Sequence, residues 1–227
     1  MISAHILTLS IPWTLLAASL ACAADLSRYR DFQFGMNLPA VVKIVSMSPS
    51  EAKVIHQRPA LIQDLDWPLG RYLRSSPADA GPVKDILFSF CNGELFRMVV
   101  NYDRYKTAGL TAEDMIDGIS AKYGTATRPT AEILFPSILN ERVKVIARWE
   151  DSEYSFDLVR SSYQPEFAMV LYSKRLDALA QTAITEALRL DEQEAPQREA
   201  DRQKKQEGEN RVKEEKARLA NKASFRP

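Results

Sequence analysis

Residues 83–102 constrain the fold most, because apolar and polar side chains alternate on both sides of an Asn-Gly pair. The two apolar rows are Ile86, Phe88 and Phe90 before the pair, and Phe96, Met98, Val100 and Tyr102 after it. Alternation places every second side chain on one face of a strand, and Asn-Gly is the commonest sequence of a tight hairpin turn. This segment therefore predicts a β-hairpin with one apolar face.

The length of the hairpin loop decides which residues face each other. A two-residue loop at 92–93 would split the two apolar rows between opposite faces, because side chains in a strand repeat every two residues. A three-residue loop at 91–93 keeps both rows on one face, with Phe88 opposite Phe96. Burying such a row contributes about 25 cal/mol per Å² of apolar surface, which outweighs the preference of the turn. We therefore predict the longer loop, with Cys91 exposed and able to form only an intermolecular disulfide.

Three more strands are predicted between residues 143 and 171, joined by turns at 150–153 and 161–165. Their alternating apolar residues are Val143, Val145, Ala147 and Trp149, then Tyr154, Phe156 and Leu158, then Phe167, Met169 and Leu171. Short turns between consecutive strands indicate an antiparallel meander. Lys144, Arg148 and Arg160 alternate with the apolar residues, so we expect them on the solvent face.

Three segments have the spacing of amphipathic helices. The first follows the capping residue Asn37 and carries Leu38, Val41, Val42 and Val45. The second begins after Thr111, which forms a capping box with Asp114, and ends at Gly124. The third begins near residue 174 and carries Leu176, Leu179, Ala180, Ala183, Ile184, Ala187 and Leu188.

The order of these elements is helix, strands, helix, strands, helix. It predicts an α+β domain over residues 24–190, with helices packed on one face of an antiparallel sheet. Each half, 30–103 and 104–190, contains a helix followed by a β-meander, which indicates two structural repeats.

The two ends of the chain differ from this domain. Residues 1–23 are apolar and end in Ala21-Cys22-Ala23, which predicts a secretory signal peptide and a periplasmic or secreted protein. The alternative is a lipid anchor on Cys22. Residues 191–227 contain ten Lys or Arg and nine Asp or Glu, which predicts a charged tail, helical or disordered. A partner-binding helix is the alternative there, although it lacks the apolar stripe that such helices use.

The overall charge excludes some functions. Thirty basic residues balance thirty acidic ones, so the clustered positive field of nucleic-acid-binding proteins is not expected. The mature chain has no apolar segment long enough to predict a membrane span. The expected partner is therefore an envelope or extracellular protein.

A short motif adds a resemblance to a known family. Phe34, Gly35, Met36, Leu38 and Val42 resemble the opening of the small outer-membrane assembly lipoproteins of the BamE (SmpA/OmlA) family. The motif is also similar to the related β-lactamase-inhibitor-protein-like fold, which has two helix-plus-sheet repeats. The Gly-x-Pro that closes the family's first helix has no match at residues 46–50. The resemblance implies an envelope or secreted binding module that is not an enzyme.

Candidate catalytic groups are few. Cys91 and His56 could form a nucleophile and base, but nothing in the sequence brings them together. The Ser-x-x-Lys motif at residues 50–53 lacks the partner motifs of penicillin-recognising enzymes. Asp64 and Asp66 share one face of a strand, and Glu150, Asp151 and Glu153 lie in a turn, so these carboxylates could bind calcium or act as an acid/base pair. Solvated surface positions explain them equally.

These observations favour a non-catalytic module that binds a protein of the cell envelope through the exposed face of its sheet. We assign no catalytic, cofactor-binding or metal-binding residue. Two alternatives are a carboxylate-based hydrolase and a carrier of small ligands or lipids.

Overall fold

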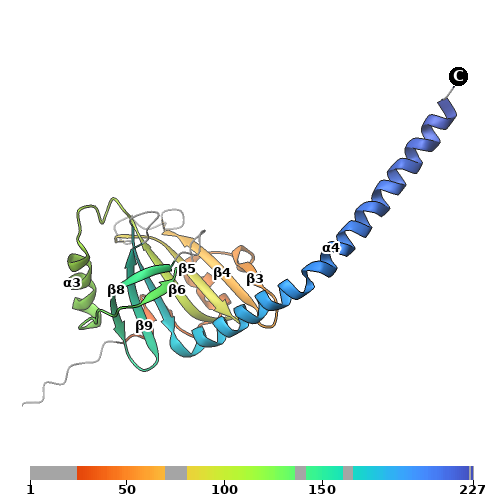
Figure 1. Ribbon diagram of the computed structural model, residues 1–227. Coiled ribbons are helices and arrows are strands. Elements are labelled where there is room, and N and C mark those ends of the chain that lie inside the picture. The colour runs from red at the N-terminus through yellow and green to blue at the C-terminus, as the bar shows by residue number, and fades with distance from the viewer. Residues whose placement is uncertain (1–24, 70–80, 136–141, 161–165, 225, 227) are drawn as a thin grey trace, which may run out of the picture.

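A computed structural model describes residues 25–69, 81–135, 142–160, 166–224 and 226 (Figure 1). The predicted signal peptide at 1–23 and the predicted turn at 161–165 lie outside these residues. The chain folds into an α+β structure with an antiparallel sheet, as the sequence predicts. In chain order the elements are β1 Arg28–Tyr29, β2 Phe32–Gln33, α1 Leu38–Val45, the 3₁₀ turn Pro49–Glu51, β3 Lys53–His56, β4 Ile62–Pro68, β5 Val83–Cys91, β6 Glu94–Tyr102, α3 Ala112–Tyr123, β7 Glu132–Leu134, β8 Arg142–Glu150, β9 Tyr154–Arg160, β10 Phe167–Ser173 and α4 Lys174–Ser224.

The main sheet joins two similar halves. Its strand order is β3-β4-β5-β6-β10-β9-β8-β7, and every neighbouring pair is antiparallel. The first half is α1 followed by the four strands β3 to β6, and the second is α3 followed by β7 to β10. The last strands of the two halves, β6 and β10, pair at the centre of the sheet, with Met98 opposite Leu171. This order matches the predicted pair of helix-plus-meander units.

The predicted three-residue loop of the central hairpin is wrong. Cys91 pairs with Glu94, so the loop is the two-residue Asn92-Gly93 turn, with φ angles of 50° and 85°. The register then shifts between Ser89 and Phe90, which makes Phe96 an extra residue on β6 and places Phe88 opposite Met98. This bulge lets the favoured turn occur while Phe88, Met98 and Val100 stay on one face, and it moves Phe96 to the opposite face.

The sheet is covered on both faces. One face packs against α1, α3 and the β1–β2 hairpin, in a core that includes Phe88, Met98 and Leu158. The side chains that alternate with these form a second cluster around Val99 and a third under α4 that contains Cys91 and Phe96. Nearly all described residues of β5, β6, β9 and β10 are buried or half-buried, so the expected open sheet face is not found.

The helix ends follow the predicted chemistry. The Asn37 side chain accepts a hydrogen bond from the Ala40 backbone N–H at 2.9 Å, and it begins α1. Thr111 and Asp114 form the predicted capping box of α3, and Gly124 ends that helix with a φ of 80°. α1 and α3 lie on the same face, as expected, whereas α4 packs on the opposite one.

A second bulge redirects the side chains of β8. The register shifts between Val145 and Ala147, so Val145 packs in the second cluster and Ala147 in the main core. The single alternating row predicted for this strand is therefore divided between two faces. Lys144 and Arg160 are exposed, as expected, but Arg148 is half-buried.

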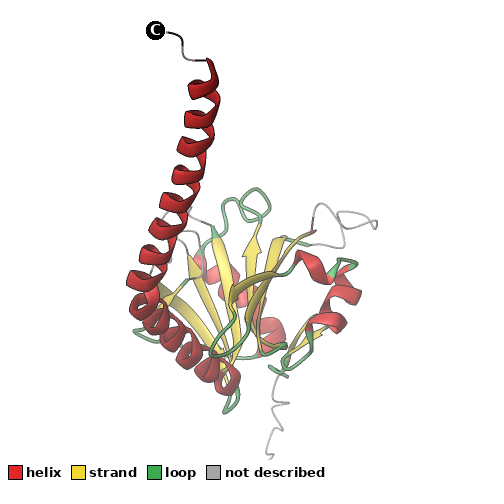
Figure 2. Cartoon of the chain, turned by 90° about the vertical axis from the view of Figure 1, so that its right-hand side faces the viewer, coloured by secondary structure: helices red, strands yellow, loops and turns green. Residues whose placement is uncertain are grey.

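Helix α4 has 51 residues and two distinct parts. Its first part is held on the sheet by the buried side chains of Leu176, Ala180 and Ala187, while Leu179 and Leu188 are exposed, contrary to the predicted stripe. From residue 195 onward every described side chain is exposed. Figures 1 and 2 show this second part leaving the domain as an arm. The charged tail is therefore helical to Ser224.

Candidate functional site

A row of polar side chains crosses the sheet on the face that α4 covers. Strand register aligns its members laterally, so that each lies beside the next on a neighbouring strand. We call it the polar row. In the spatial order of the strands, β4-β5-β6-β10-β9-β8, its residues are Asp64, Ser89, Arg97, Tyr172, Ser155 and Glu150. It crosses both halves of the sheet, and its two central members, Arg97 and Tyr172, stand where the halves join.

Arg97, at the centre of the row, binds α4. Its Nε and Nη2 atoms lie 2.9 Å and 2.5 Å from Oδ1 of Asp177 in the first turn of that helix. Each side chain is only 16% exposed, so the ion pair is largely shielded from water. Burial outweighs the attraction of Arg97 and raises the pKa of Asp177. A shielded pair of this kind selects one position of the helix on the sheet, because any shift leaves both charges unpaired.

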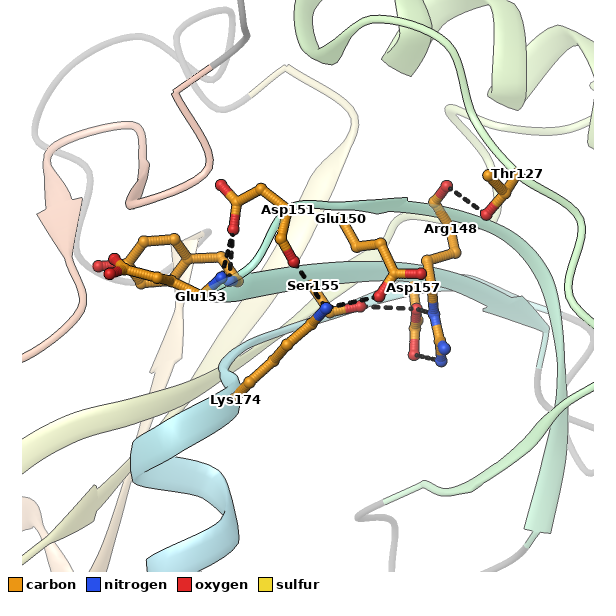
Figure 3. Close-up of polar contacts among 9 residues, drawn as sticks. Thr127, Arg148, Glu150, Asp151, Glu153, Ser155, Asp157 and Lys174 are labelled. Atoms are coloured by element: carbon orange, nitrogen blue, oxygen red, sulfur yellow. Dashed lines mark hydrogen bonds and ion pairs between the residues drawn. The ribbon is translucent and has the colours of Figure 1, made fainter.

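The acidic turn between β8 and β9 holds the start of α4 (Figure 3). The Lys174 ammonium donates to the Glu150 carboxylate at 2.6 Å and to the Asp151 carbonyl oxygen at 2.7 Å. The Lys174 backbone N–H donates to the Glu153 carbonyl oxygen at 2.8 Å. The Asp151 carboxylate accepts from the backbone N–H groups of Glu153 and Tyr154, each at 2.7 Å. The cluster predicted as a calcium candidate thus anchors a helix.

Asp157 is the most deeply buried charge of this face. It is 0% exposed and binds Arg148 through two parallel hydrogen bonds, Nε to Oδ1 at 2.6 Å and Nη2 to Oδ2 at 2.7 Å (Figure 3). The Ser155 hydroxyl also donates to Oδ1 at 3.3 Å. Asp157 raises the pKa of Arg148, which keeps that guanidinium charged. This two-point geometry fixes β8 against β9.

Asp64 and Asp66 lie on one face of β4, as predicted, but in different environments. Asp64 is opposite Ser89 and half-buried, whereas Asp66 is exposed. Burial raises the pKa of Asp64. A hydrogen bond with Ser89 and the charge of Arg97 lower this pKa, but their effect is smaller than that of burial. Asp64 is therefore part of the polar row. No group of three His, Cys, Asp or Glu side chains in the described chain is arranged to hold a metal ion.

Cys91 is buried, contrary to the prediction that it is exposed. Its side chain is 8% exposed and packs with Phe96 and Leu176, because the two-residue turn makes Cys91 the last residue of β5. Burial also raises the pKa of its thiol. His56 is aligned with Ile62, and Ile62 with Cys91, so Ile62 stands between the imidazole and the thiol. The structure does not bring them together as a nucleophile and base.

Sequence reasoning missed Arg97, Asp157 and Tyr172. Arg97 and Asp157 each stand between apolar neighbours, in Phe96-Arg97-Met98 and Phe156-Asp157-Leu158, and Tyr172 follows the apolar run Met169-Val170-Leu171. A charged residue inside a buried strand requires a partner, and this was the available signal. The partners themselves lie on other strands or on α4, and only the register identifies them.

The fold and this site define an α+β protein whose sheet carries an anchored, projecting helix. Comparisons with protein-family models, curated proteins and solved structures gave no match to the chain. Among the described residues, none of the helices combines the length and the hydropathy of a membrane span.

Proposed function

We propose that this protein is a secreted or periplasmic, non-catalytic module that binds another protein of the cell envelope, and that α4 is its binding arm. The observation that carries the proposal is the contrast along α4. Its first turns are anchored by Lys174, Asp177 and buried alanines, whereas its outer part is exposed on all sides. A domain that holds one end of a long helix leaves the other end accessible to a partner.

The outer part of α4 has local support of its own. Ion pairs join Arg198 with Glu194, Arg202 with Glu199, and Arg218 with Glu215. Oppositely charged pairs spaced three or four residues apart favour the helical conformation slightly. Val212 and Leu219 are the large apolar residues exposed on this part, and they are one heptad apart. We propose that they lie on the face that meets the partner.

Two of the carboxylates that the alternative hydrolase would use have protein partners. Glu150 binds Lys174, and Asp64 lies beside Ser89 in the polar row. The use of Glu150 in anchoring α4 and of Asp64 within the sheet favours a binding module over a hydrolase. The resemblance of residues 34–42 to the envelope lipoproteins supports the same proposal, and it stays a prediction.

Site-specific photocrosslinking in cells tests the binding arm. A photoreactive amino acid is placed at Val212 and Leu219, and at Leu179 on the anchored part as a matched exposed control. We expect one and the same partner protein to crosslink from Val212 and Leu219 and not from Leu179. Equal crosslinking from all three positions, or none from any, would contradict the proposal.

Export is tested separately by the mass of the protein isolated from cells. Cleavage after Ala23 removes residues 1–23 and leaves Ala24 as the first residue. The alternative lipid anchor would leave Cys22 as the first residue and add the mass of its acyl chains. A protein that keeps residues 1–23 and stays in the cytoplasm would contradict the proposed location.

A further inference from the structure

Pro196 lies in the interior of α4, where the part held on the sheet meets the exposed outer part. Proline has no backbone N–H, so the carbonyl oxygen of Glu192 receives no hydrogen bond from residue 196, and the proline ring crowds the same carbonyl group. Sharp bends in helices occur mainly at such positions. In both Figures 1 and 2, α4 bends between the part that lies along the sheet and the part that leaves it.

The last side chain of α4 that is shielded by the domain belongs to Glu194, two positions before this proline. Glu194 is half-buried, and its carboxylate accepts a hydrogen bond from Arg58 in the segment that joins β3 to β4. No described side chain after Pro196 is buried against the domain. The direction of the outer part therefore depends on the helix backbone at Pro196 and on the charges around it.

Arg198 reaches back across the proline. Its Nη2 atom donates to Oδ1 of Asp191 at 2.6 Å and to the Asp191 carbonyl oxygen at 3.3 Å, and it lies 3.6 Å from Oε2 of Glu194. In a straight helix Asp191 and Arg198 would be about 10.5 Å apart along the axis. A regular helix also reserves the carbonyl of residue 191 for the N–H of residue 195. The contact of a side chain with this carbonyl indicates that the backbone is opened at the bend.

Four charged residues thus meet where α4 leaves the domain, and we call them the exit cluster: Arg58, Asp191, Glu194 and Arg198. The hydrogen bond from Arg198 lowers the pKa of Asp191, and the charges of His56 and Arg58 also lower it. The four side chains are 39–55% exposed, so salt screens the attraction between them. The exit cluster joins the domain and both parts of α4 through weak, reversible contacts.

We propose that Pro196 is a hinge about which the outer part of α4 pivots, and that the exit cluster holds this part in one direction. Separating Arg198 from Asp191 frees the outer part to turn. The anchors of α4 at Lys174 and Asp177 lie on the other side of the hinge and stay in place. The arm can therefore change direction without α4 leaving the sheet. This proposal holds whether or not the arm binds a partner.

Distances between spin labels, measured by pulsed electron paramagnetic resonance, test the hinge. The labels are attached to Val54→Cys on β3 and Val212→Cys on the outer part of α4, both exposed positions, in a full chain that also carries Cys22→Ala and Cys91→Ala. Val212 lies about 24 Å along the helix beyond Pro196, so a pivot of about 20° moves it by about 8 Å. The pair Val54→Cys and Leu188→Cys, with Leu188 exposed before the hinge, is the control.

We expect one narrow Val54–Val212 distribution at low salt. It should broaden by about 8 Å in about 1 M salt, where the Debye length falls to about 3 Å. Arg198→Gln should give the broad distribution at low salt. Arg202→Gln is the matched control and should not, because Arg202 pairs with Glu199 on its own side of the hinge.

Pro196→Ala removes the hinge itself. It restores the backbone hydrogen bond of the helix, so the Val54–Val212 distribution should stay narrow at both salt concentrations. The double variant Pro196→Ala/Arg198→Gln should be narrow as well. The Val54–Leu188 distance should remain unchanged in every variant.

Three results would overturn the proposal. The first is an Arg198→Gln distribution no broader than that of Arg202→Gln. The second is a double variant as broad as Arg198→Gln alone. The third is a Val54–Leu188 distribution that broadens together with the other pair, because α4 would then be leaving the sheet instead of pivoting. These distances are measured on the protein alone, so failure to crosslink a partner in cells does not affect them.

Discussion

Arg97 on β6 and Asp177 on α4 form an ion pair that joins the centre of the sheet to the helix, with 2.5 Å between Nη2 and Oδ1. The two residues are 80 positions apart in the chain. Their pairing places α4 across both halves of the sheet and sets the direction in which its outer part leaves the domain. A contact at the middle of the sheet therefore helps to position α4 on the domain.

Removing one member of this pair should destabilise the protein more than removing both. Arg97→Met leaves Asp177 largely buried without its cation, and we expect the free energy of unfolding to fall by about 2–4 kcal/mol at neutral pH. The double variant Arg97→Met/Asp177→Leu leaves no unpaired charge and should recover most of this loss. Urea unfolding of the wild type, both single variants and the double variant measures the coupling. Strictly additive losses would show that the pair is not coupled.

Asp64→Asn should stabilise the protein at neutral pH but not in acid. Burial raises the pKa of Asp64 from its ordinary value of 3.8, so the folded protein binds this proton more tightly than the unfolded chain does. Asp64 therefore contributes favourably to the free energy of unfolding below the pKa that its carboxyl has in the unfolded chain. This contribution is lost as the pH rises through the pKa of Asp64 in the folded protein.

Urea unfolding at about pH 3 and pH 7 checks this prediction. The midpoint of Asp64→Asn should exceed that of the wild type at pH 7 and equal it at pH 3. Asp66→Asn is the matched control, because Asp66 is an exposed carboxylate on the same face of β4, and it should change the midpoint at pH 7 less than Asp64→Asn does. A lower midpoint for Asp64→Asn at pH 7 would contradict the assigned cause.

Ending the chain after Leu190 should change the melting temperature little. Beyond this residue the described side chains of α4 are exposed, apart from a half-buried Glu194 that pairs with the exposed Arg58. Exposed ion pairs contribute little to stability, so we expect a shift of less than about 4 °C for a domain of this size. Calorimetry measures the shift, and circular dichroism should show the lost helix. A decrease of many degrees would show that the outer part of α4 packs on the domain.

Cys91 should resist thiol reagents in the folded protein. Its side chain is buried under α4 and its thiol pKa is raised, so both access and the thiolate fraction are low. We expect labelling of a Cys22→Ala chain to be slow in buffer and rapid in denaturant. Adding Leu219→Cys, an exposed position on α4, gives the fast control. Rapid labelling of Cys91 in buffer would show that α4 opens away from the sheet.

The elements of the fold were predictable where local chemistry is strong. The caps at Asn37 and Thr111 and the alternation in β9 and β10 act over a few residues, and all appear as expected. The short edge strands β3 and β7 were not predicted, because strands of four and three residues carry too little alternation. The hairpin register failed because a bulge at Phe96 adds a residue that no alternation pattern shows.

The candidate site was less predictable than the fold. Asp64 and Glu150 were recognised as carboxylates of interest, but their partners Ser89 and Lys174 lie on other elements. Cys91 was assigned to the surface because the loop length was wrong by one residue. Each of these errors concerns a contact between elements rather than an element.

The sequence by itself determined the α+β class, the helix caps and the charged character of residues 191–227, because these depend on side-chain periodicity and composition. Only the tertiary structure decided that β6 pairs with β10, that α4 crosses the second face of the sheet, and that Arg97, Asp157 and Cys91 are buried there. The physical reason is that a buried charge or thiol is defined by its partners. Those partners are brought together by strand register and helix docking, which depend on the whole fold.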